Sequence, residues 1–222
     1  MRQRVRGVRK EVLKLKHSHY MREPVRRTLT SDAAIRVISR DGIAAASLRR
    51  IAQEADVPLS SLNHVYPSKQ DLLRDAWDRS HQLVFQIVEE VIDSRPKTLH
   101  GAVSTLILAF VGGEQPITPQ SSSESRAHIE NAQRAQYELY LWASRIPDGG
   151  DNDVTDYSPA IFSIETFLKS YEYPGVNAEA LSQVVAAMID GLFLQTMSGN
   201  SVGSNRDRVD RISAGLISSC TD

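Results

Sequence analysis

The residues of this chain that could do chemistry gather in one short stretch, AQEADVPLSSLNHVYPSKQDLL, at residues 52–73. It holds four small hydrogen-bonding side chains and one basic residue: Ser60, Ser61, Asn63, His64 and Lys69. Elsewhere Asp, Glu and His do not gather at metal-ligand spacing. We also find no nucleophile elbow, phosphate-binding glycine loop or paired acid and base. The sequence therefore predicts no catalytic site, no metal site and no cofactor.

The breaks on either side of these polar residues predict a very short helix. Pro58 suits the first turn of a helix, and Pro67 disfavours helical geometry at Tyr66, so this helix can run only to about Val65. Two turns of helix are marginal alone, because nucleation is costly and packing must supply the stability. A preceding helix opened by Ser47, a good N-cap, can supply that packing.

Helix, tight turn and helix is the geometry in which the second helix enters the major groove of DNA. In this arrangement Val57 and Leu62 fill the angle between the helices, and Tyr66 packs the following turn against the first helix. The residues left for the outer face are Leu59, Ser60, Ser61, Asn63 and His64.

Apolar residues at helical spacing run through most of the chain, and no segment predicts a strand. The pattern indicates about nine helices, at about 25–42, 48–55, 58–65, 69–93, 99–111, 125–145, 159–171, 178–197 and 206–219. Ser68 can cap the long helix that begins at Lys69. We therefore predict an all-α protein with three parts: a basic arm (1–24), a helix-turn-helix domain (25–75) and a helical domain (76–222).

Charge divides the chain in the same way. Residues 1–75 hold 16 basic and 8 acidic side chains, whereas residues 76–222 hold 10 and 19, so the two parts carry +8 and −9. This asymmetry indicates that only the N-terminal part meets a polyanion. The arm, residues 2–22, could bind a minor groove or the DNA backbone. It could equally be a solvated tail, or an over-long translation start ahead of Met21.

Two further features of the sequence predict the cellular compartment of the protein. A single cysteine, Cys220, excludes a disulfide framework within the chain. No apolar run approaches the length of about 20 residues that spanning a membrane requires. Both features predict a cytoplasmic protein without a membrane partner.

Residues 25–75 resemble the DNA-binding domain of the tetracycline-repressor (TetR) family of bacterial transcriptional regulators. The matching positions follow the family pattern in order: Asp32-Ala33-Ala34, Gly42, Ser47, Ile51-Ala52, Leu62 to Tyr66, Ser68-Lys69 and Leu72-Leu73. Three positions depart from it. Asp56 stands where the family most often has glycine, Asn63 where it has a phosphate-contacting tyrosine, and Val65 replaces a common aromatic. Aspartate tolerates positive φ, so we expect the turn to survive.

The resemblance implies a double-stranded DNA partner. Ser47 would offer its hydroxyl and N–H to a phosphate, unless it serves as a cap only, and Arg49 and Lys69 would bind phosphates. Arg50 is expected to be a solvated side chain. The implied base-facing residues are Leu59, Ser60, Ser61, Asn63 and His64.

The resemblance also implies a homodimer on a palindromic operator and an unknown small hydrophobic effector. The predicted dimer interface consists of Leu181, Val185, Met188, Leu192, Val209, Ile212 and Leu216. The predicted ligand contacts are Phe110, Tyr137, Tyr140, Trp142, Phe162, Phe167 and Met188. Ligand binding would tilt the helix that follows Lys69 and release a repressor from its operator.

Three other functions stay open at this point: an activator, a DNA-binding protein without a ligand sensor, and a helical enzyme. An apolar pocket in residues 76–222 would count against the sensorless protein.

Overall fold

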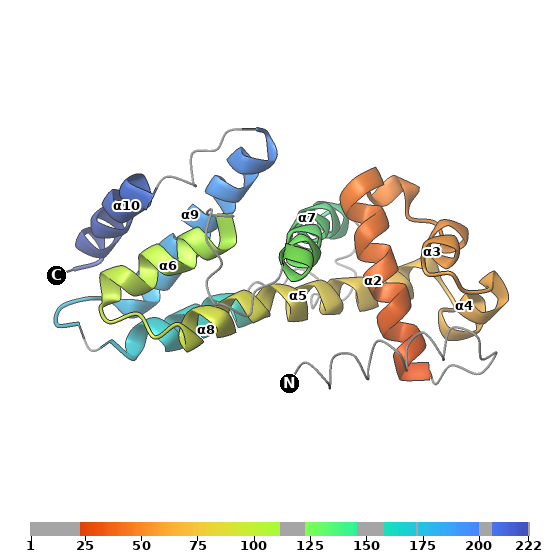
Figure 1. Cartoon of the computed structure of the whole chain (residues 1–222), viewed down its shortest axis with the longest axis horizontal. Coiled ribbons are helices and arrows are strands. Elements are labelled where there is room, and N and C mark those ends of the chain that lie inside the picture. The colour runs from red at the N-terminus through yellow and green to blue at the C-terminus, as the bar shows by residue number, and fades with distance from the viewer. Residues whose placement is uncertain (1–22, 112–122, 146–157, 172, 200–205, 222) are drawn as a thin grey trace. The chain divides into compact units, whose positions relative to one another are not determined.

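The computed structural model describes residues 23–111, 123–145, 158–171, 173–199 and 206–221, which fold almost entirely as α-helices (Figure 1). Nine of them are present in these ranges: α2 (Glu23–Asp41), α3 (Leu48–Glu54), α4 (Leu59–Val65), α5 (Lys69–Asp93), α6 (Leu99–Val111), α7 (Ser123–Ala143), α8 (Ser158–Lys169), α9 (Ala178–Met197) and α10 (Arg206–Ser219). A 3-10 turn, η1 (Ile43–Ala45), precedes α3. The predicted all-α fold is confirmed. Nearly all of the predicted basic arm lies outside the described residues.

The contacts divide the chain into two compact units. The first consists of residues 1–80 and Asn131–Arg145, and the second of His81–Glu130 and Ile146–Asp222. Helices α5 and α7 each contribute residues to both units. Part of α7 thus belongs with the helices of the predicted helix-turn-helix domain, although it lies far beyond the boundary predicted at residue 75.

The turn between α3 and α4 depends on Asp56, which has φ of 55°. The Asp56 N–H donates to the Gln53 carbonyl at 3.2 Å, and the Val57 N–H donates to the Ala52 carbonyl at 3.0 Å. This pair of bonds is a Schellman motif, which satisfies the last carbonyls of α3 through a left-handed residue. The expectation that aspartate takes the glycine position of this turn is confirmed.

The long helix α5 begins at a reciprocal cap. The Ser68 N–H donates to Oδ2 of Asp71 at 3.0 Å, and the Asp71 N–H donates to Oγ of Ser68 at 3.2 Å. Such a box satisfies two of the N–H groups that a helix N-terminus leaves unbonded. The predicted start of this helix after Pro67 is therefore correct.

The second unit contains a helical core in which α6 packs against α9 and α10, and α9 also packs against α8. Leu106, Ile107 and Leu181 are fully buried in it. A buried polar contact crosses this apolar core: the Ser104 hydroxyl donates to Oγ of Ser213 at 3.0 Å. The bond joins α6 to α10 without leaving either hydroxyl unsatisfied.

Several residues of the predicted dimer interface are buried within this core. The side chains of Leu181, Val185, Leu192 and Val209 are covered by their own chain. Met188, Ile212 and Leu216 are half-buried against the same core. A fully covered side chain cannot meet a second copy, so the apolar stripe formed by Leu181, Val185, Leu192 and Val209 packs inside the monomer. Helical periodicity identifies a buried face but does not say which chain buries it.

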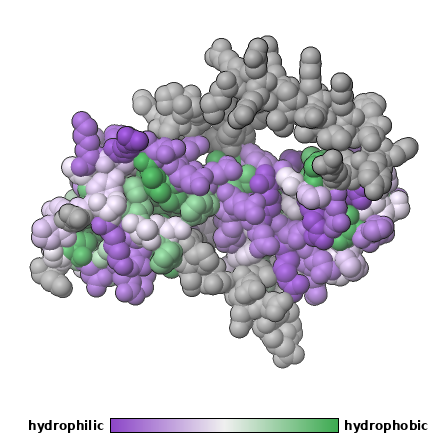
Figure 2. All heavy atoms as spheres, turned by 90° about the horizontal axis from the view of Figure 1, so that it is seen from below, coloured by the Kyte–Doolittle hydropathy of each residue, from purple (hydrophilic) through white to green (hydrophobic). Residues whose placement is uncertain are grey.

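Helix α9 also corrects an expectation about membranes. Ala178–Met197 is long and apolar enough, by length and composition, to cross a bilayer. The expectation that no segment would reach this length was wrong. However, the helix carries Leu181, Ser182 and Val185 inside the core of the second unit, as core helices of globular domains do. On the face shown in Figure 2, hydrophilic side chains predominate, and hydrophobic ones form small separate patches.

Candidate nucleic-acid interface

The short helix α4 has one buried and one exposed face. Leu62 and Val65 are buried, and Pro58 stands at the N-cap position. The outer face carries four exposed residues and one half-buried one: Leu59, Ser60, Asn63 and His64, with Ser61 half-buried. This arrangement matches the predicted outer face residue by residue. This face carries no lysine, arginine or carboxylate, so any electrostatic attraction to DNA would have to come from flanking residues.

Ser47 opens α3 as predicted. Its backbone is extended, and its hydroxyl accepts a hydrogen bond from the Arg50 N–H at 3.2 Å. The next two basic residues differ in their surroundings. Arg49 is exposed, whereas the guanidinium of Arg50 lies 3.5 Å from the Asp41 carboxylate. Arg49 is therefore the better placed of the two for a phosphate.

Lys69 has a partner that its sequence position does not predict. Its Nζ donates to the backbone carbonyl of Ile43 at 3.2 Å, and the side chain is partly buried. The amine thereby joins the start of α5 to the turn before α3. Sequence reasoning missed this contact because the partner is a backbone atom 26 residues away.

Ion pairs hold α2 against α3. Arg36 pairs with Glu54 at 3.1 Å, and Arg40 pairs with both Glu54 and Asp41, at 3.2 and 2.9 Å. Partial burial acts to raise the pKa of Glu54, but the hydrogen bonds from Arg36 and Arg40 outweigh it and lower this pKa below its ordinary value. Hydrogen bonding from Arg40 likewise lowers the pKa of Asp41.

Tyr66 closes the motif at the end of α4. The residue is buried, and its hydroxyl lies within hydrogen-bonding distance of Asp75 and Thr30. The guanidinium of Arg27 stacks over its ring, 5.3 Å from the centroid, while Nη1 of Arg27 donates to Asp75 at 2.7 Å. Burial raises the pKa of Tyr66. Helix α4 is thus anchored to α2 and α5 through one tyrosine.

The predicted ligand contacts are divided between the two units. Tyr137, Tyr140 and Trp142 lie on the part of α7 that belongs to the first unit. The other four lie in the second unit: Phe110, Phe162, Phe167 and Met188. Phe167 is buried, whereas Phe162 is 68% exposed.

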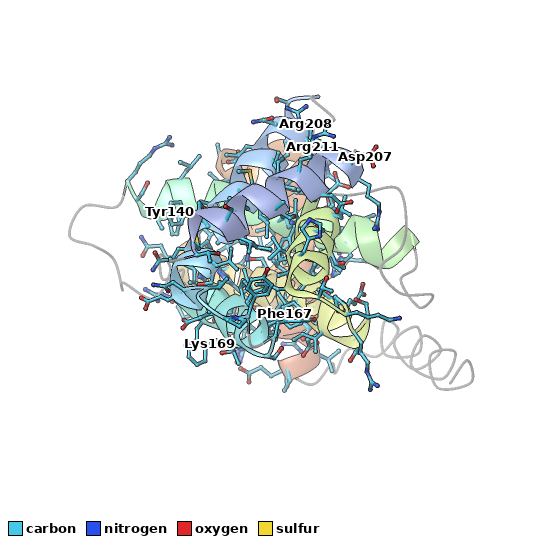
Figure 3. The ribbon with its side chains drawn as sticks, turned by 90° about the vertical axis from the view of Figure 1, so that its left-hand side faces the viewer. Tyr140, Phe167, Lys169, Asp207, Arg208 and Arg211 are labelled. Atoms are coloured by element: carbon cyan, nitrogen blue, oxygen red, sulfur yellow. The ribbon has the colours of Figure 1, made fainter. Side chains whose placement is uncertain are left out.

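Around Phe167, the second unit holds an aromatic pair that the sequence did not single out. Tyr171 meets the Phe167 ring edge-on, with centroids 5.5 Å apart, and its hydroxyl donates to the Pro96 carbonyl at 3.0 Å. Figure 3 shows Phe167 on α8, together with the charged residues at the start of α10. Among the described residues, no group of three or more His, Cys, Asp or Glu is arranged to hold a metal ion.

Comparison with known proteins agrees with this geometry. Residues 31–76 match the sequence profile described as "Bacterial regulatory proteins, tetR family". These residues contain α3, the Asp56 turn, α4 and the start of α5. The chain belongs to the TetR family of transcriptional regulators. The family consists of DNA-binding regulators and not of enzymes, so the alternative of a helical enzyme is excluded.

The relatives of this TetR-family protein extend over most of its length. The nicotine-responsive transcriptional repressor HdnoR of Paenarthrobacter nicotinovorans is 27% identical over 190 residues, which is 84% of this chain and 91% of that one. The transcriptional regulator BetI of Rhizobium meliloti is 29% identical over 178 residues, 78% of each chain. A solved structure of the multidrug binding protein EbrR, in complex with imidazole, covers 91% of this chain and 96% of its own, at 25% identity and a TM-score of 0.61.

Proposed function

We propose that this protein is a cytoplasmic repressor that binds a palindromic operator as a homodimer and leaves it when a small organic cation binds. The outer face of α4, set on a TetR-type helix-turn-helix, is the observation that carries the proposal. In such a motif the exposed face of the second helix meets the base edges of the major groove.

The proposed DNA contacts divide into base readers and phosphate ligands. Leu59 would contact a thymine methyl group, and Asn63 would pair with adenine. Ser60, Ser61 and His64 would meet neighbouring base edges. Ser47 and Arg49 would bind phosphate and fix the register of the helix. Lys69 would contribute to DNA binding through its positive charge, and also through its hydrogen bond to the Ile43 carbonyl, which supports the turn before α3.

For the dimer we propose the outward face of α9 and α10 in place of the buried stripe. On α9 this face carries Val184 and Leu194, which are 37% and 47% exposed, with Gly191 between them. On α10 it carries the exposed residues Ala214 and Gly215. A Cβ atom built on Gly191 or Gly215 would meet nothing within 4 Å. Glycine in the middle of a helix costs about 1 kcal/mol relative to alanine, and close approach of a partner helix would explain its presence.

The proposed effector is a small organic cation with an apolar body. HdnoR is nicotine-responsive, and EbrR has been solved with malachite green and ethidium as well as imidazole. These compounds are nitrogen bases or organic cations. In this chain residues 76–222 carry a charge of −9, which favours a cationic ligand. Phe110, Phe167 and Met188 pack on one core cluster and would receive it there.

Coupling between ligand and DNA would pass along helices that the two units share. Residues from both units belong to α5, and the same holds for α7. A ligand that shifts either helix would change the separation of the two copies of α4 in the dimer. Ligand and operator would then oppose each other by the same coupling energy, typically about 1–3 kcal/mol.

The test starts by selecting DNA fragments from a random pool with the purified full-length protein. We expect a palindrome whose half-site centres lie about one helical turn apart, roughly 10–10.5 base pairs, or a multiple of it. Operator affinity is then measured with ethidium, malachite green and nicotine added in turn. A fall in affinity with at least one of them supports the proposed release. If a compound binds the protein but leaves operator affinity unchanged, the proposed coupling is wrong, while the DNA-binding function stands on the selection alone.

A further inference from the structure

We propose that Asn131 and Glu138 on α7 are positioning residues for DNA binding, because they hold the turn that sets the start of α3. Neither residue belongs to the segment that matches the family profile. Both lie in the part of α7 that packs within the first unit. They are seven residues apart and so lie on one face of the helix.

The turn that they hold is the connection from α2 to α3. Gly42 has φ of 78° and ψ of 165°, a combination that is essentially restricted to glycine. The 3-10 turn at Ile43–Ala45 follows, and Ser47 then caps α3. The orientation of the α3 N-terminus, where Ser47 and Arg49 would meet a phosphate, therefore depends on this short turn.

Both backbone polar groups of Ile43 are bound by side chains from outside the turn. Its N–H donates to Oε2 of Glu138 at 3.4 Å, and its carbonyl accepts from Nζ of Lys69 at 3.2 Å. Glu138 lies close enough that a Cβ atom on Gly42 would be 3.9 Å from Oε2. Helix α7 therefore holds the turn on one side, and the start of α5 holds it on the other.

A second bond fixes α7 to α2 just before the turn. The Ser39 hydroxyl donates to Oδ1 of Asn131 at 3.0 Å. Ala132, Ala135 and Leu139 of the same helix are fully buried, so α7 has a packed face that keeps Asn131 and Glu138 in place. The two polar contacts thus act from a rigid support, which is what positioning requires.

If its negative charge were its only contribution, Glu138 would weaken DNA binding instead of supporting it. A carboxylate in the DNA-binding unit repels phosphate, so its removal should strengthen DNA binding if electrostatics were its whole contribution. A positioning role predicts weaker binding when the acceptor is lost, and little change when only the charge is lost. Glutamine at position 138 separates the two effects, because it keeps an oxygen acceptor without the charge.

The experiment measures affinity for the operator fragment selected by the full-length wild-type protein, over a range of salt concentrations. We expect Glu138→Ala and Asn131→Ala each to weaken operator binding by roughly three- to tenfold, the size of one modest hydrogen bond. Glu138→Gln should bind within about twofold of wild type, since its amide oxygen can accept the same bond. The salt slope should change by less than the value of about 0.9 expected for one lost phosphate contact, because none of these side chains is proposed to bind phosphate itself.

Two controls complete the design. Glu89→Ala removes the same charge from an exposed site on α5 in the second unit and should not weaken operator binding. Ser39→Ala, alone and combined with Asn131→Ala, forms a double-mutant cycle in which the second substitution should add little. The midpoint of thermal unfolding identifies any variant that loses its fold.

The proposal is overturned if Glu138→Ala and Asn131→Ala bind the operator as wild type does. It is also overturned if Glu138→Ala and Glu138→Gln both bind more tightly, since charge repulsion then accounts for the whole effect. Failure of the wild-type protein to select any DNA would instead contradict the DNA-binding function itself.

Discussion

The hydroxyl of Tyr66 lies 2.8 Å from Oδ2 of Asp75, the same oxygen that accepts from Arg27 at 2.7 Å. One carboxylate therefore joins the end of α4, the first turns of α2 and the start of α5. Since Tyr66 directly follows α4, this contact fixes where that helix ends relative to its neighbours. The aromatic residue in the sequence motif thus contributes through its hydroxyl as well as its ring.

Tyr66→Phe should lower the free energy of unfolding by about 1 kcal/mol, the usual net value of one intramolecular hydrogen bond. The loss is modest because Asp75 keeps its bond from Arg27, and the ring stays in place. Urea unfolding measures it. Tyr173→Phe is the matched control, because Tyr173 is 55% exposed and should tolerate the change. Equal stability of the two variants would contradict a role for the Tyr66 hydroxyl.

The effect of a substitution at Asp56 on stability should depend on how well the new residue tolerates the positive φ of this position. Asp56→Gly should leave stability unchanged or raise it, whereas Asp56→Val should cost about 1–2 kcal/mol, because a β-branched residue is strained in the left-handed region. Thermal unfolding compares these with Gln53→Val, which places valine at an exposed helical position with ordinary geometry. If the two valine variants lose equal stability, the left-handed conformation of Asp56 carries no special cost.

How far the sequence predicted the structure depended on the range of each interaction. The Ser47 cap, the Asp56 turn and the start of α5 at Ser68 were predicted correctly, since neighbours within a few residues determine them. The contact of Lys69 with Ile43 was missed. It depends on how distant segments pack, and no local pattern encodes it.

The same limit applies to the apolar stripes. The α9 stripe through Leu181 and Val185 was recognised as a buried face, but the neighbours that bury it are α6 and α8 of the same chain. Likewise, the pattern of α7 predicted a helix without showing that Asn131–Arg145 packs with the DNA-binding helices. Hydrophobic periodicity gives the direction of burial and leaves the partner open.

Acid should weaken the contact between α2 and α3. The pKa of Glu54 is lowered in the folded protein, so the folded state favours the carboxylate. The contribution of ionised Glu54 to folding stability is present above its unfolded pKa of about 4.5. It is lost as pH falls through the lower pKa of Glu54 in the folded protein. Glu54→Gln should therefore show a shallower loss of stability than wild type below about pH 4.5, in urea titrations at several pH values. Identical pH profiles would show that these ion pairs do not contribute.

The two adjacent arginines of α3 should differ in DNA binding. Arg49→Ala should make the fall of log affinity with log salt shallower by about 0.9, the value for one lost phosphate contact. Arg50→Ala should leave the slope unchanged, because its guanidinium is paired with Asp41. Fluorescence anisotropy with the selected operator, at several salt concentrations, gives both slopes. A smaller slope for Arg50→Ala than for Arg49→Ala would reverse the assignment.

Gly191 offers a test of the proposed dimer face that leaves the monomer intact. A side chain at this position meets no atom of its own chain within 4 Å, and replacing a mid-helix glycine with leucine should stabilise α9 by about 0.5–1 kcal/mol. Gly191→Leu should nevertheless weaken dimerisation, because leucine would separate helices that approach closely at a small residue. Sedimentation equilibrium over a range of protein concentrations measures the shift.

The matched variant is Gly191→Ala, which raises helix propensity with a much smaller side chain and should dimerise more tightly than Gly191→Leu. Operator binding should follow the same order, because a monomer occupies only one half-site of a palindrome. Gly215→Leu on α10 tests the other half of the face, where a Cβ atom also meets nothing within 4 Å. If both leucine variants remain dimers with unchanged dissociation constants, the outward face of α9 and α10 is not the interface, and a dimer must use another surface.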